Sequence, residues 1–291
     1  MILLPGQDKK FSQTNRSNVL GNIWSSFNLD LSSNLGRLRL SPRLLVNTTT
    51  ATDSSLTTAP CAFRLFHGIA DSVDKLWTIS GTKVHSATTT DGLIGVFAAD
   101  GTAGTPTDCD VAYSDMELFD DNLFVSGKSN VLYYLNAAGA WTGTLTIGAS
   151  DVGPHPMTQY GSLLYYVRSD NIIYSIDAAA AASLLLTYKD GNQRIIWMRA
   201  ASNRIWFGTL NKQGGKGEIC EWDGAASQIA RSYRLRAQGA LACVIKDDIP
   251  WVMDSNGRLL RWNGGTFDEV ARLPIEKGFL VNATSKINNR F

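Results

Sequence analysis

Two pairs of adjacent aspartates are the residues best placed to do chemistry in this chain: Asp120–Asp121 and Asp247–Asp248. Hydrolysis of a glycosidic bond needs two carboxyl groups that face each other across the sugar. Both pairs fall where the sequence predicts a turn between two strands, and acidic residues are common in turns because their side chains hydrogen-bond the local backbone. We therefore interpret the four aspartates as turn residues and expect no catalytic residue in the chain.

The residues that could bind a metal or a cofactor are scattered. Asp108 and Asp110, with help from Asp115, could hold calcium, but this segment lacks the glycine and the dense acidic spacing of a calcium-binding loop. The cysteines and histidines are single and far apart: Cys61, Cys109, Cys220 and Cys243; His67, His85 and His155. Their spacing matches neither a zinc site nor a redox motif, and the sequence has no phosphate-binding glycine motif. We therefore expect no metal and no cofactor.

A pattern that repeats along the chain predicts the structural elements that would position a functional site. Five times, an aliphatic residue or proline is followed by an aromatic residue, a polar turn and a second apolar run. The five aromatics are Trp77, Phe124, Tyr165, Trp206 and Trp251, and successive members are 47, 41, 41 and 45 residues apart. A period of about 40–50 residues with several short strands per unit is typical of the blades of a β-propeller. Because a blade cannot cover both of its faces alone, we expect these rings to pack between neighbouring blades.

The last complete repeat, residues 240–274, displays four strands most clearly. Its apolar runs alternate with turns and span residues 242–245, 249–253, 258–262 and 266–273. Asn256–Gly257 separates the middle pair, and Asn-Gly is the dipeptide that tight hairpin turns prefer. The middle strands of the earlier repeats are predicted at 76–80 and 83–86, 122–126 and 131–135, 162–167 and 172–176, and 204–209 and 217–222. The sequence thus predicts five blades of four antiparallel strands.

A sixth blade is expected from the two ends of the chain. Gly278–Asn282 is typical of an inner strand, and Gly36–Leu40 and Leu44–Val46 can supply strands from the other end. A blade built from both termini would close the ring and leave no exposed sheet edge. The predicted fold is therefore all-β, a β-propeller of about six four-stranded blades formed by residues 61–291, preceded by an extended N-terminal arm and linker at residues 1–60.

The first 60 residues differ in composition from the repeats. Nine of the twelve residues from Asn47 to Thr58 are Ser, Thr or Asn, which is typical of a linker. Ahead of the linker, polar and apolar residues alternate as in a half-buried strand. The candidate assembly arm comprises Leu29, Leu31, Arg37, Leu38, Arg39, Leu40 and Arg43. Two interpretations stay open: strand addition to this ring or to a neighbouring subunit, and a disordered leader.

Charge is balanced overall but uneven along the chain. The net charge is +1; residues 61–150 carry ten acidic and four basic side chains, whereas residues 231–291 carry six acidic and ten basic ones. Such asymmetry can steer self-assembly or docking, or it can be scattered charge without a role. Acidic residues lie among the C-terminal arginines, so the sequence does not favour nucleic acid as a partner. No run of about 18 apolar residues occurs, and we expect a protein without a membrane segment that stays in a cytoplasm until assembly.

The layout of the whole chain resembles virion proteins of tailed bacteriophages. The resemblance lies in Phe27–Leu31, Gly36–Leu44 and the turn region Ser255–Gly264, with a polar spacer between the arm and the repeats. The chain is similar to the propeller-bearing tail nozzle and related tail or capsid-associated proteins, although it is shorter. The resemblance implies a non-enzymatic structural subunit that acts through subunit contacts. Its partners would be other virion proteins and copies of itself, and its location the virion, assembled in the host cytoplasm.

Two other functions are compatible with a propeller. A carbohydrate-binding propeller for host-surface recognition would stack sugars on loop aromatics, for which Trp141, Tyr160 and Trp197 are the candidates. A propeller-type hydrolase or lyase would instead place converging carboxylates and arginines at one end of the central channel. Only apolar or scattered polar residues at the channel would count against the enzyme.

Overall fold

The computed structural model describes residues 29–30, 39–40, 56, 61–68, 73–90, 93–94, 97–136, 138–147, 152–188 and 190–272. The chain forms two units, residues 1–51 and 52–291. In the first unit, β1 (Leu29–Asp30) pairs antiparallel with β2 (Arg39–Leu40). These strands contain three residues of the candidate assembly arm, and the other four lie outside the described residues.

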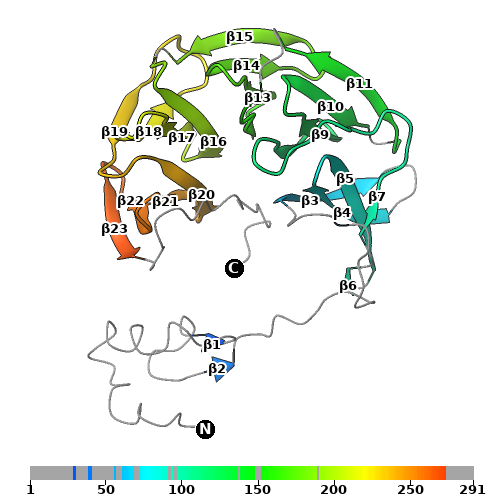
Figure 1. Cartoon of the computed structure of the whole chain (residues 1–291), viewed down its shortest axis with the longest axis horizontal. Coiled ribbons are helices and arrows are strands. Elements are labelled where there is room, and N and C mark those ends of the chain that lie inside the picture. Colours follow the sequence, from blue (N-terminus) through cyan, green and yellow to red (C-terminus); the bar gives the residue numbers. More distant parts are fainter. Residues whose placement is uncertain are drawn as a thin grey trace. The chain divides into compact units, whose positions relative to one another are not determined.

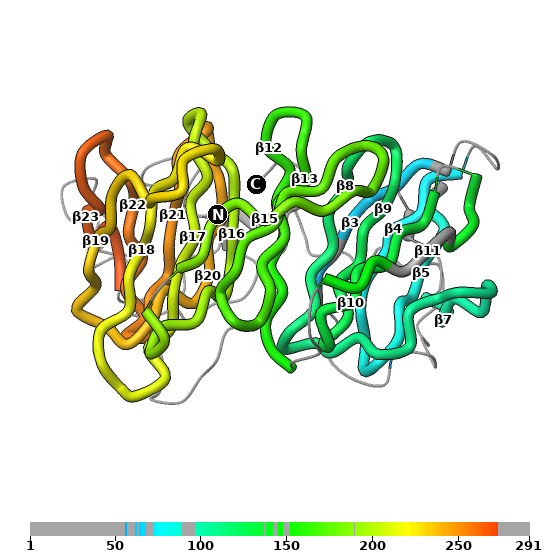
Figure 2. Tube along the Cα trace, turned by 90° about the horizontal axis from the view of Figure 1, so that it is seen from above, coloured from blue at the N-terminus to red at the C-terminus, as the bar shows by residue number. Residues whose placement is uncertain are grey.

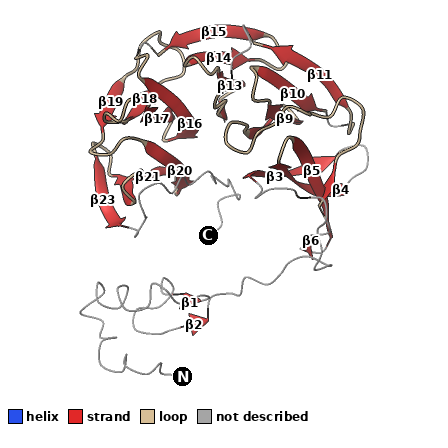
Figure 3. Ribbon diagram, in the orientation of Figure 1, coloured by secondary structure: helices blue, strands red, loops and turns tan. Residues whose placement is uncertain are grey.

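The second unit contains five antiparallel sheets, which we call blades 1 to 5 in chain order (Figures 1 and 3). Blade 1 contains β3 (Cys61–Gly68), β4 (Val73–Ser80), β5 (Lys83–Thr90), β6 (Leu93–Ile94) and β7 (Ala98–Ala99). Blade 2 contains β8 (Met116–Phe119), β9 (Asn122–Ser126), β10 (Val131–Leu135) and β11 (Trp141–Thr146), and blade 3 contains β12 (Met157–Tyr160), β13 (Leu163–Val167), β14 (Ile172–Ile176) and β15 (Ala182–Thr187). Blade 4 contains β16 (Gln193–Ala201), β17 (Arg204–Asn211), β18 (Glu218–Trp222) and β19 (Arg231–Arg234), and blade 5 contains β20 (Ala240–Lys246), β21 (Ile249–Asp254), β22 (Arg258–Trp262) and β23 (Phe267–Arg272).

The blades follow one another in chain order, with their first strands innermost (Figures 1 and 2). Contacts join β3 to β8, β8 to β12, β12 to β16 and β16 to β20. Four of the sheets have four strands, and blade 1 has five because β5 pairs first with β7 and then with β6. The predicted all-β propeller fold is confirmed. In the part of the chain that the structure describes, no helix has the length and hydropathy needed to cross a membrane.

Tight turns join the first and second strands of blades 2, 4 and 5. Both central residues of each turn have a positive φ: 48° and 57° at Asp120–Asp121, 52° and 54° at Ser202–Asn203, and 52° and 59° at Asp247–Asp248. Asp and Asn tolerate this left-handed conformation better than most residues do, which explains why they occur here. The predicted role of the two aspartate pairs as turn residues agrees with their place in the fold. Because all inner strands run in the same direction, the three turns lie at the same end of the blades.

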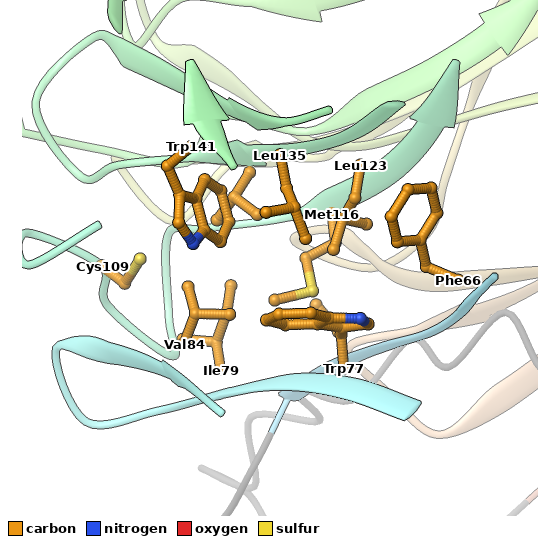
Figure 4. Packing of buried hydrophobic residues seen from close by; sticks show 11 residues of the cluster. Phe66, Trp77, Ile79, Val84, Cys109, Met116, Leu123, Leu135 and Trp141 are labelled. Atoms are coloured by element: carbon orange, nitrogen blue, oxygen red, sulfur yellow. The ribbon is translucent and has the colours of Figure 1, made fainter. Parts of the chain in front are cut away.

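A separate apolar core fills each interface between consecutive described blades. Between blades 1 and 2, Trp77 packs against Met116 and Leu123, and its ring meets that of Trp141 edge to face at a centroid distance of 6.1 Å (Figure 4). Phe124 lies in the core between blades 2 and 3, Tyr165 in the core between blades 3 and 4, and Trp206 in the core between blades 4 and 5. Burial of such aromatic side chains holds neighbouring sheets together.

Trp251 differs from the other four aromatics of the repeat. It is only half-buried, and its ring lies under the guanidinium group of Arg261 at 5.4 Å. The bulk of the indole therefore faces away from the core between blades 4 and 5. The predicted sixth blade cannot be placed beside this face, because Gly278–Asn282 and Leu44–Val46 lie outside the described residues. The described part of Gly36–Leu40 pairs with Leu29–Asp30.

Asp100, which follows β7, makes the blade 1 edge sensitive to acid. Its carboxylate accepts hydrogen bonds from Trp141 Nε1 (2.6 Å) and from the Thr102 hydroxyl and backbone N–H (2.7 and 3.0 Å). Burial alone would raise the pKa of Asp100, but these hydrogen bonds outweigh burial and hold the pKa below its ordinary value. A lowered pKa means that Asp100 stabilises the fold above the pKa of the unfolded chain, about 3.9, and loses this contribution as the pH falls through the folded value.

We expect Asp100→Asn to lower the thermal unfolding midpoint at pH 7, and the gap to the unsubstituted protein to close below about pH 4. The uncharged amide does not titrate, so only the unsubstituted protein loses this contribution in acid. Circular dichroism melts of both proteins between neutral and acidic pH measure the gap. A gap that stays constant with pH would mean that the carboxylate charge contributes nothing.

Candidate active site

Two of the three inner turns are used to connect neighbouring blades. Ser202 of blade 4 donates from its backbone N–H to Asp248 Oδ1 (2.7 Å) and from its hydroxyl to Asp248 O (2.6 Å). Tyr160 of blade 3 donates its hydroxyl to Asn203 O (2.8 Å). Asp248 therefore has a structural role, since its carboxylate and carbonyl oxygen both bind the adjacent turn.

The Asp120–Asp121 turn of blade 2 is different, because it lines a cavity of about 530 Å³. The described residues form no hydrogen bond or ion pair with either carboxylate. The cavity is contributed by blades 1, 2 and 3, and its lining residues are Leu65, Phe66, His67, Leu118, Phe119, Asp120, Asp121, Asn122 and Gln159. Its volume lies in the range of small-molecule sites, and its mixture of apolar walls and a few polar groups is typical of them.

His67 brings a titratable ring to this cavity in a fixed orientation. It lies directly opposite Asp74 in the β3–β4 pair, and its Nδ1 is 2.7 Å from Asp74 Oδ1. An ionised carboxylate only accepts hydrogen bonds, so Nδ1 carries the proton and Nε2 is the nitrogen left to act on a ligand. The two side chains are 58% and 51% exposed, which leaves the ring accessible from the cavity. A histidine oriented by a carboxylate is the arrangement that general acid–base catalysis uses.

A buried network of four charged side chains lies along the same inner strands. Arg64 of β3 is 3.6 Å from Asp115 and 3.5 Å from Glu117, both of blade 2, and Arg199 of β16 is 3.4 Å from Asp115. None of the four is more than 8% exposed. Asp115 also accepts the backbone N–H of Met157 in β12 (3.2 Å), so its carboxylate contacts the inner strands of blades 1, 3 and 4.

The charged network adjoins the cavity along β3 and β8. Arg64 precedes Leu65 in β3, and Glu117 precedes Leu118 in β8; both leucines line the cavity. One residue of strand advances about 3.3 Å. The network therefore joins the strands that carry the cavity walls, and its four side chains are buried between the blades.

Sequence reasoning missed most of this arrangement. Arg64, Glu117 and Arg199 were not among the candidate residues, and Asp115 was considered only as a calcium ligand. The available signal was weak: Arg64, Glu117 and Arg199 each sit in an inner strand between two apolar neighbours. Their partners are 53 and 84 residues away for Arg64–Glu117 and Arg199–Asp115.

Two of the suggested calcium ligands have hydrogen-bond partners of their own. Asp108 accepts the hydroxyl of Tyr133 (2.7 Å), and Asp110 accepts the backbone N–H of Ala112 (2.8 Å). Burial and the adjacent Asp108 carboxylate raise the pKa of Tyr133, so the phenol keeps the proton that it donates. Among the described residues, no group of three His, Cys, Asp or Glu side chains is placed to hold a metal ion.

Two of the three candidate glycan-stacking aromatics are buried. Trp141 is 8% exposed and packs on Trp77, and Trp197 is 2% exposed and donates its Nε1 to Ala240 O (2.6 Å). Both belong to strands, β11 and β16, and not to loops. Their rings offer no face to a sugar, and only Tyr160 keeps part of its ring at the surface.

No family model and no curated protein matches the sequence. Solved structures do resemble the fold. A streptogramin B lyase has a TM-score of 0.56 at 14% identity, covering 78% of this chain and 72% of its own, and virginiamycin B lyase from Staphylococcus aureus has 0.58 at 14% identity, covering 78% and 73%. A chain of the mitotic checkpoint complex has 0.57 at 12% identity, covering 87% and 74%. The chain is a β-propeller. At these identities the likeness concerns the fold alone.

These comparisons correct the expectation of a non-enzymatic virion subunit. Two of the propellers that share the fold are lyases, and none of the three is described as a phage protein. Of the features that the resemblance to tail proteins implied, only the propeller fold is confirmed. The error has a physical reason: repeats and turns define the scaffold of a propeller, whereas function depends on side chains that converge near its axis.

Proposed function

We propose that this propeller is a lyase that works by general acid–base catalysis in the cavity between blades 1, 2 and 3. The observation that carries the proposal is the cavity itself, which brings His67, held by Asp74, to the same space as the carboxylates of Asp120 and Asp121, to which the described residues offer no partner. The described residues that line the cavity include no Ser, Thr, Cys or Lys, so this part of the wall offers no hydroxyl, thiol or amine as a nucleophile. The lyase titles of two solved structures with this fold support elimination over hydrolysis.

His67 performs the proton transfers in this mechanism. Its Nε2 removes a proton from the carbon next to a substrate carbonyl group, and Asp74 stabilises the imidazolium that forms. The electron pair of the broken C–H bond forms a carbon–carbon double bond and expels the leaving group from the adjacent carbon. The leaving group then takes the proton from Nε2, which returns His67 to its neutral form.

Gln159 is placed to assist the same step. It is exposed, it lines the cavity, and its side-chain amide makes no hydrogen bond within the described residues. An amide N–H donates to the carbonyl oxygen on which negative charge develops when the proton leaves. The apolar walls, formed by Phe66 and Phe119, exclude water from one side of the reacting carbon.

We expect His67→Gln to lower kcat by about 10²–10⁴-fold, because glutamine fills the space but cannot exchange a proton near neutral pH. Asp74→Asn should also lower kcat, but by less, since it removes the charge that stabilises the imidazolium and weakens the orientation of the ring while the base itself stays in place. Activity is measured by mass spectrometry on carbonyl compounds that carry a leaving group on the β carbon. Elimination yields fragments whose masses sum to that of the substrate, whereas hydrolysis adds the mass of one water.

The matched control is Asp247→Asn, which alters the equivalent turn of blade 5 and should keep full activity. Circular dichroism establishes that each variant is folded. Products that contain an added water would replace the lyase by a hydrolase at the same site. Full activity of His67→Gln, or no turnover of any β-substituted carbonyl compound, would contradict the proposal.

A further inference from the structure

We infer that a second cavity, between blades 1 and 2, binds a short-chain carboxylate such as acetate or propionate. This cavity has a volume of about 80 Å³, and Phe66 is the one described residue that also lines the proposed active site. The inference is independent of the lyase proposal. It rests on two hydrogen-bond donors that line the cavity and have no acceptor among the described residues.

The first donor is the indole N–H of Trp77. The side chain is 4% exposed, and its Nε1 has no hydrogen-bond partner among the described residues. Figure 4 shows the nitrogen on the side of the ring toward Phe66, and both residues line the cavity. A buried donor without an acceptor costs free energy, and a bound water or ion is one way in which native proteins satisfy such a group.

The second donor is the hydroxyl group of Ser86. Ser86 lies directly opposite Trp77 in the β4–β5 pair, so the two side chains are on the same face of the sheet. The described residues offer this hydroxyl no hydrogen-bond partner either. Lys75 is two residues before Trp77 in β4, which places its side chain on this face as well. The sheet therefore presents an N–H, a hydroxyl and a cation to one small space.

Asp100 also lines the cavity, but its carboxylate is already used. It accepts hydrogen bonds from Trp141 Nε1 and from the hydroxyl and backbone N–H of Thr102. An amine on a ligand would have to compete with these donors. A carboxylate on a ligand instead supplies acceptors to the N–H of Trp77 and the hydroxyl of Ser86, and it adds a counterion for Lys75.

The size and the walls of the cavity select the rest of the ligand. One water needs about 10–15 Å³ of such space, so there is room for about five water-sized groups. Acetate has four non-hydrogen atoms and propionate has five. Phe66 and Leu135 add apolar atoms to the lining, which suit an alkyl group better than the further oxygens of an inorganic phosphate.

Propionate and propionamide test the inference, because they have the same number of non-hydrogen atoms and differ in charge. Nuclear magnetic resonance of the full chain with isotope-labelled tryptophan follows the indole N–H of Trp77, which is assigned by its absence in Trp77→Phe or by its nuclear Overhauser contacts. Propionate should move this signal in a saturable manner, with a dissociation constant at least about tenfold lower than that of propionamide. Sodium chloride at the same concentration should leave the signal in place.

Two substitutions separate the charge from the hydroxyl group. Lys75→Met keeps most of the length of the side chain and removes its charge, so it should weaken propionate binding at least about tenfold and leave propionamide unchanged. Ser86→Ala should weaken both ligands, since each offers an acceptor oxygen. The matched control is Lys83→Met, which removes an exposed charge from the same hairpin outside the cavity and should change neither affinity.

A Trp77 signal that propionate does not move, or equal affinities for propionate and propionamide, would overturn the inference and leave ordered water as the acceptor of the indole N–H. Unchanged propionate binding by Lys75→Met would overturn it as well. The lyase proposal fails separately, because His67 does not line this cavity and His67→Gln should bind propionate as the unsubstituted protein does.

Discussion

Replacement of Asp115 by alanine is expected to lower the free energy of unfolding by about 3–5 kcal/mol. The Asp115 carboxylate accepts the backbone N–H groups of Met116 (2.9 Å) and Met157 (3.2 Å), and it lies within 3.6 Å of both Arg64 and Arg199. Without it, two buried guanidinium groups keep their charge with one counterion fewer. An uncompensated buried charge costs much more than a lost hydrogen bond, and relaxation of the inner strands recovers only part of that cost. Urea unfolding at pH 7 measures the difference.

A double-mutant cycle tests whether the charges are the cause. Arg199→Met substitutes a flexible apolar side chain for the buried cation, and Asp115→Asn removes the charge of its partner while keeping its shape. The double variant should be more stable than the sum of the two single losses predicts, by at least about 1 kcal/mol. Strictly additive losses would show that the ion pair contributes nothing. Asp115→Asn also serves as the measured variant if the alanine protein does not fold.

The network of Arg64, Asp115, Glu117 and Arg199 also explains how the strands around the cavity keep their relative positions. The carboxylate of Asp115 contacts the inner strands of blades 1, 3 and 4 from its place beside β8, and these strands carry the cavity walls. Buried ion pairs add little net stability on average, but they fix the relative position of the elements that they join. We therefore assign Asp115 a positioning role: it holds Leu65 and Leu118 at the cavity without contacting the substrate.

Much of the fold was predictable because the middle strands of the blades follow local rules. The predicted strands 122–126, 131–135, 172–176 and 258–262 have the observed bounds. Each is an apolar run between turn residues whose side chains tolerate or favour the required backbone. The Asp120–Asp121 and Asp247–Asp248 turns were predicted for the same reason. Periodicity and turn chemistry act over a few residues, and a single sequence displays them directly.

The candidate site was not predictable in this way. Its cavity joins His67, the Asp120–Asp121 turn and Gln159, which come from three blades and share no local pattern. The two aspartate pairs have the same sequence and the same turn conformation, yet Asp248 binds a neighbouring turn, whereas no neighbouring turn among the described residues binds Asp120. Only the surroundings distinguish them. The same limit applies to Trp141 and Trp197, which were expected in loops and lie buried in strands.

Replacement of Trp206 by alanine is expected to cost about 3–5 kcal/mol of unfolding free energy. Trp206 is 1% exposed, and its ring centroid lies 5.0 Å from that of Trp262, 5.7 Å from Phe267 and 6.2 Å from Tyr233. Its Nε1 also donates to Ala201 O (3.1 Å). Alanine removes the side chain at the centre of this aromatic cluster, and the cavity left between blades 4 and 5 is bounded by rigid sheets that cannot collapse into it.

Trp251→Ala is the matched control, because Trp251 occupies the same position of the repeat one blade later. Its half-buried ring contacts Arg261 and contributes to no core between the described blades, so we expect a loss of about 1 kcal/mol or less. Urea unfolding of both variants under the same conditions gives the comparison. Equal losses would mean that the position in the repeat, and not the burial described for each ring, sets the contribution to the free energy of unfolding. Trp251 would then be covered as fully as Trp206. A large difference would show that the period places an aromatic residue in every blade, while its stabilising effect depends on a neighbouring sheet to cover it.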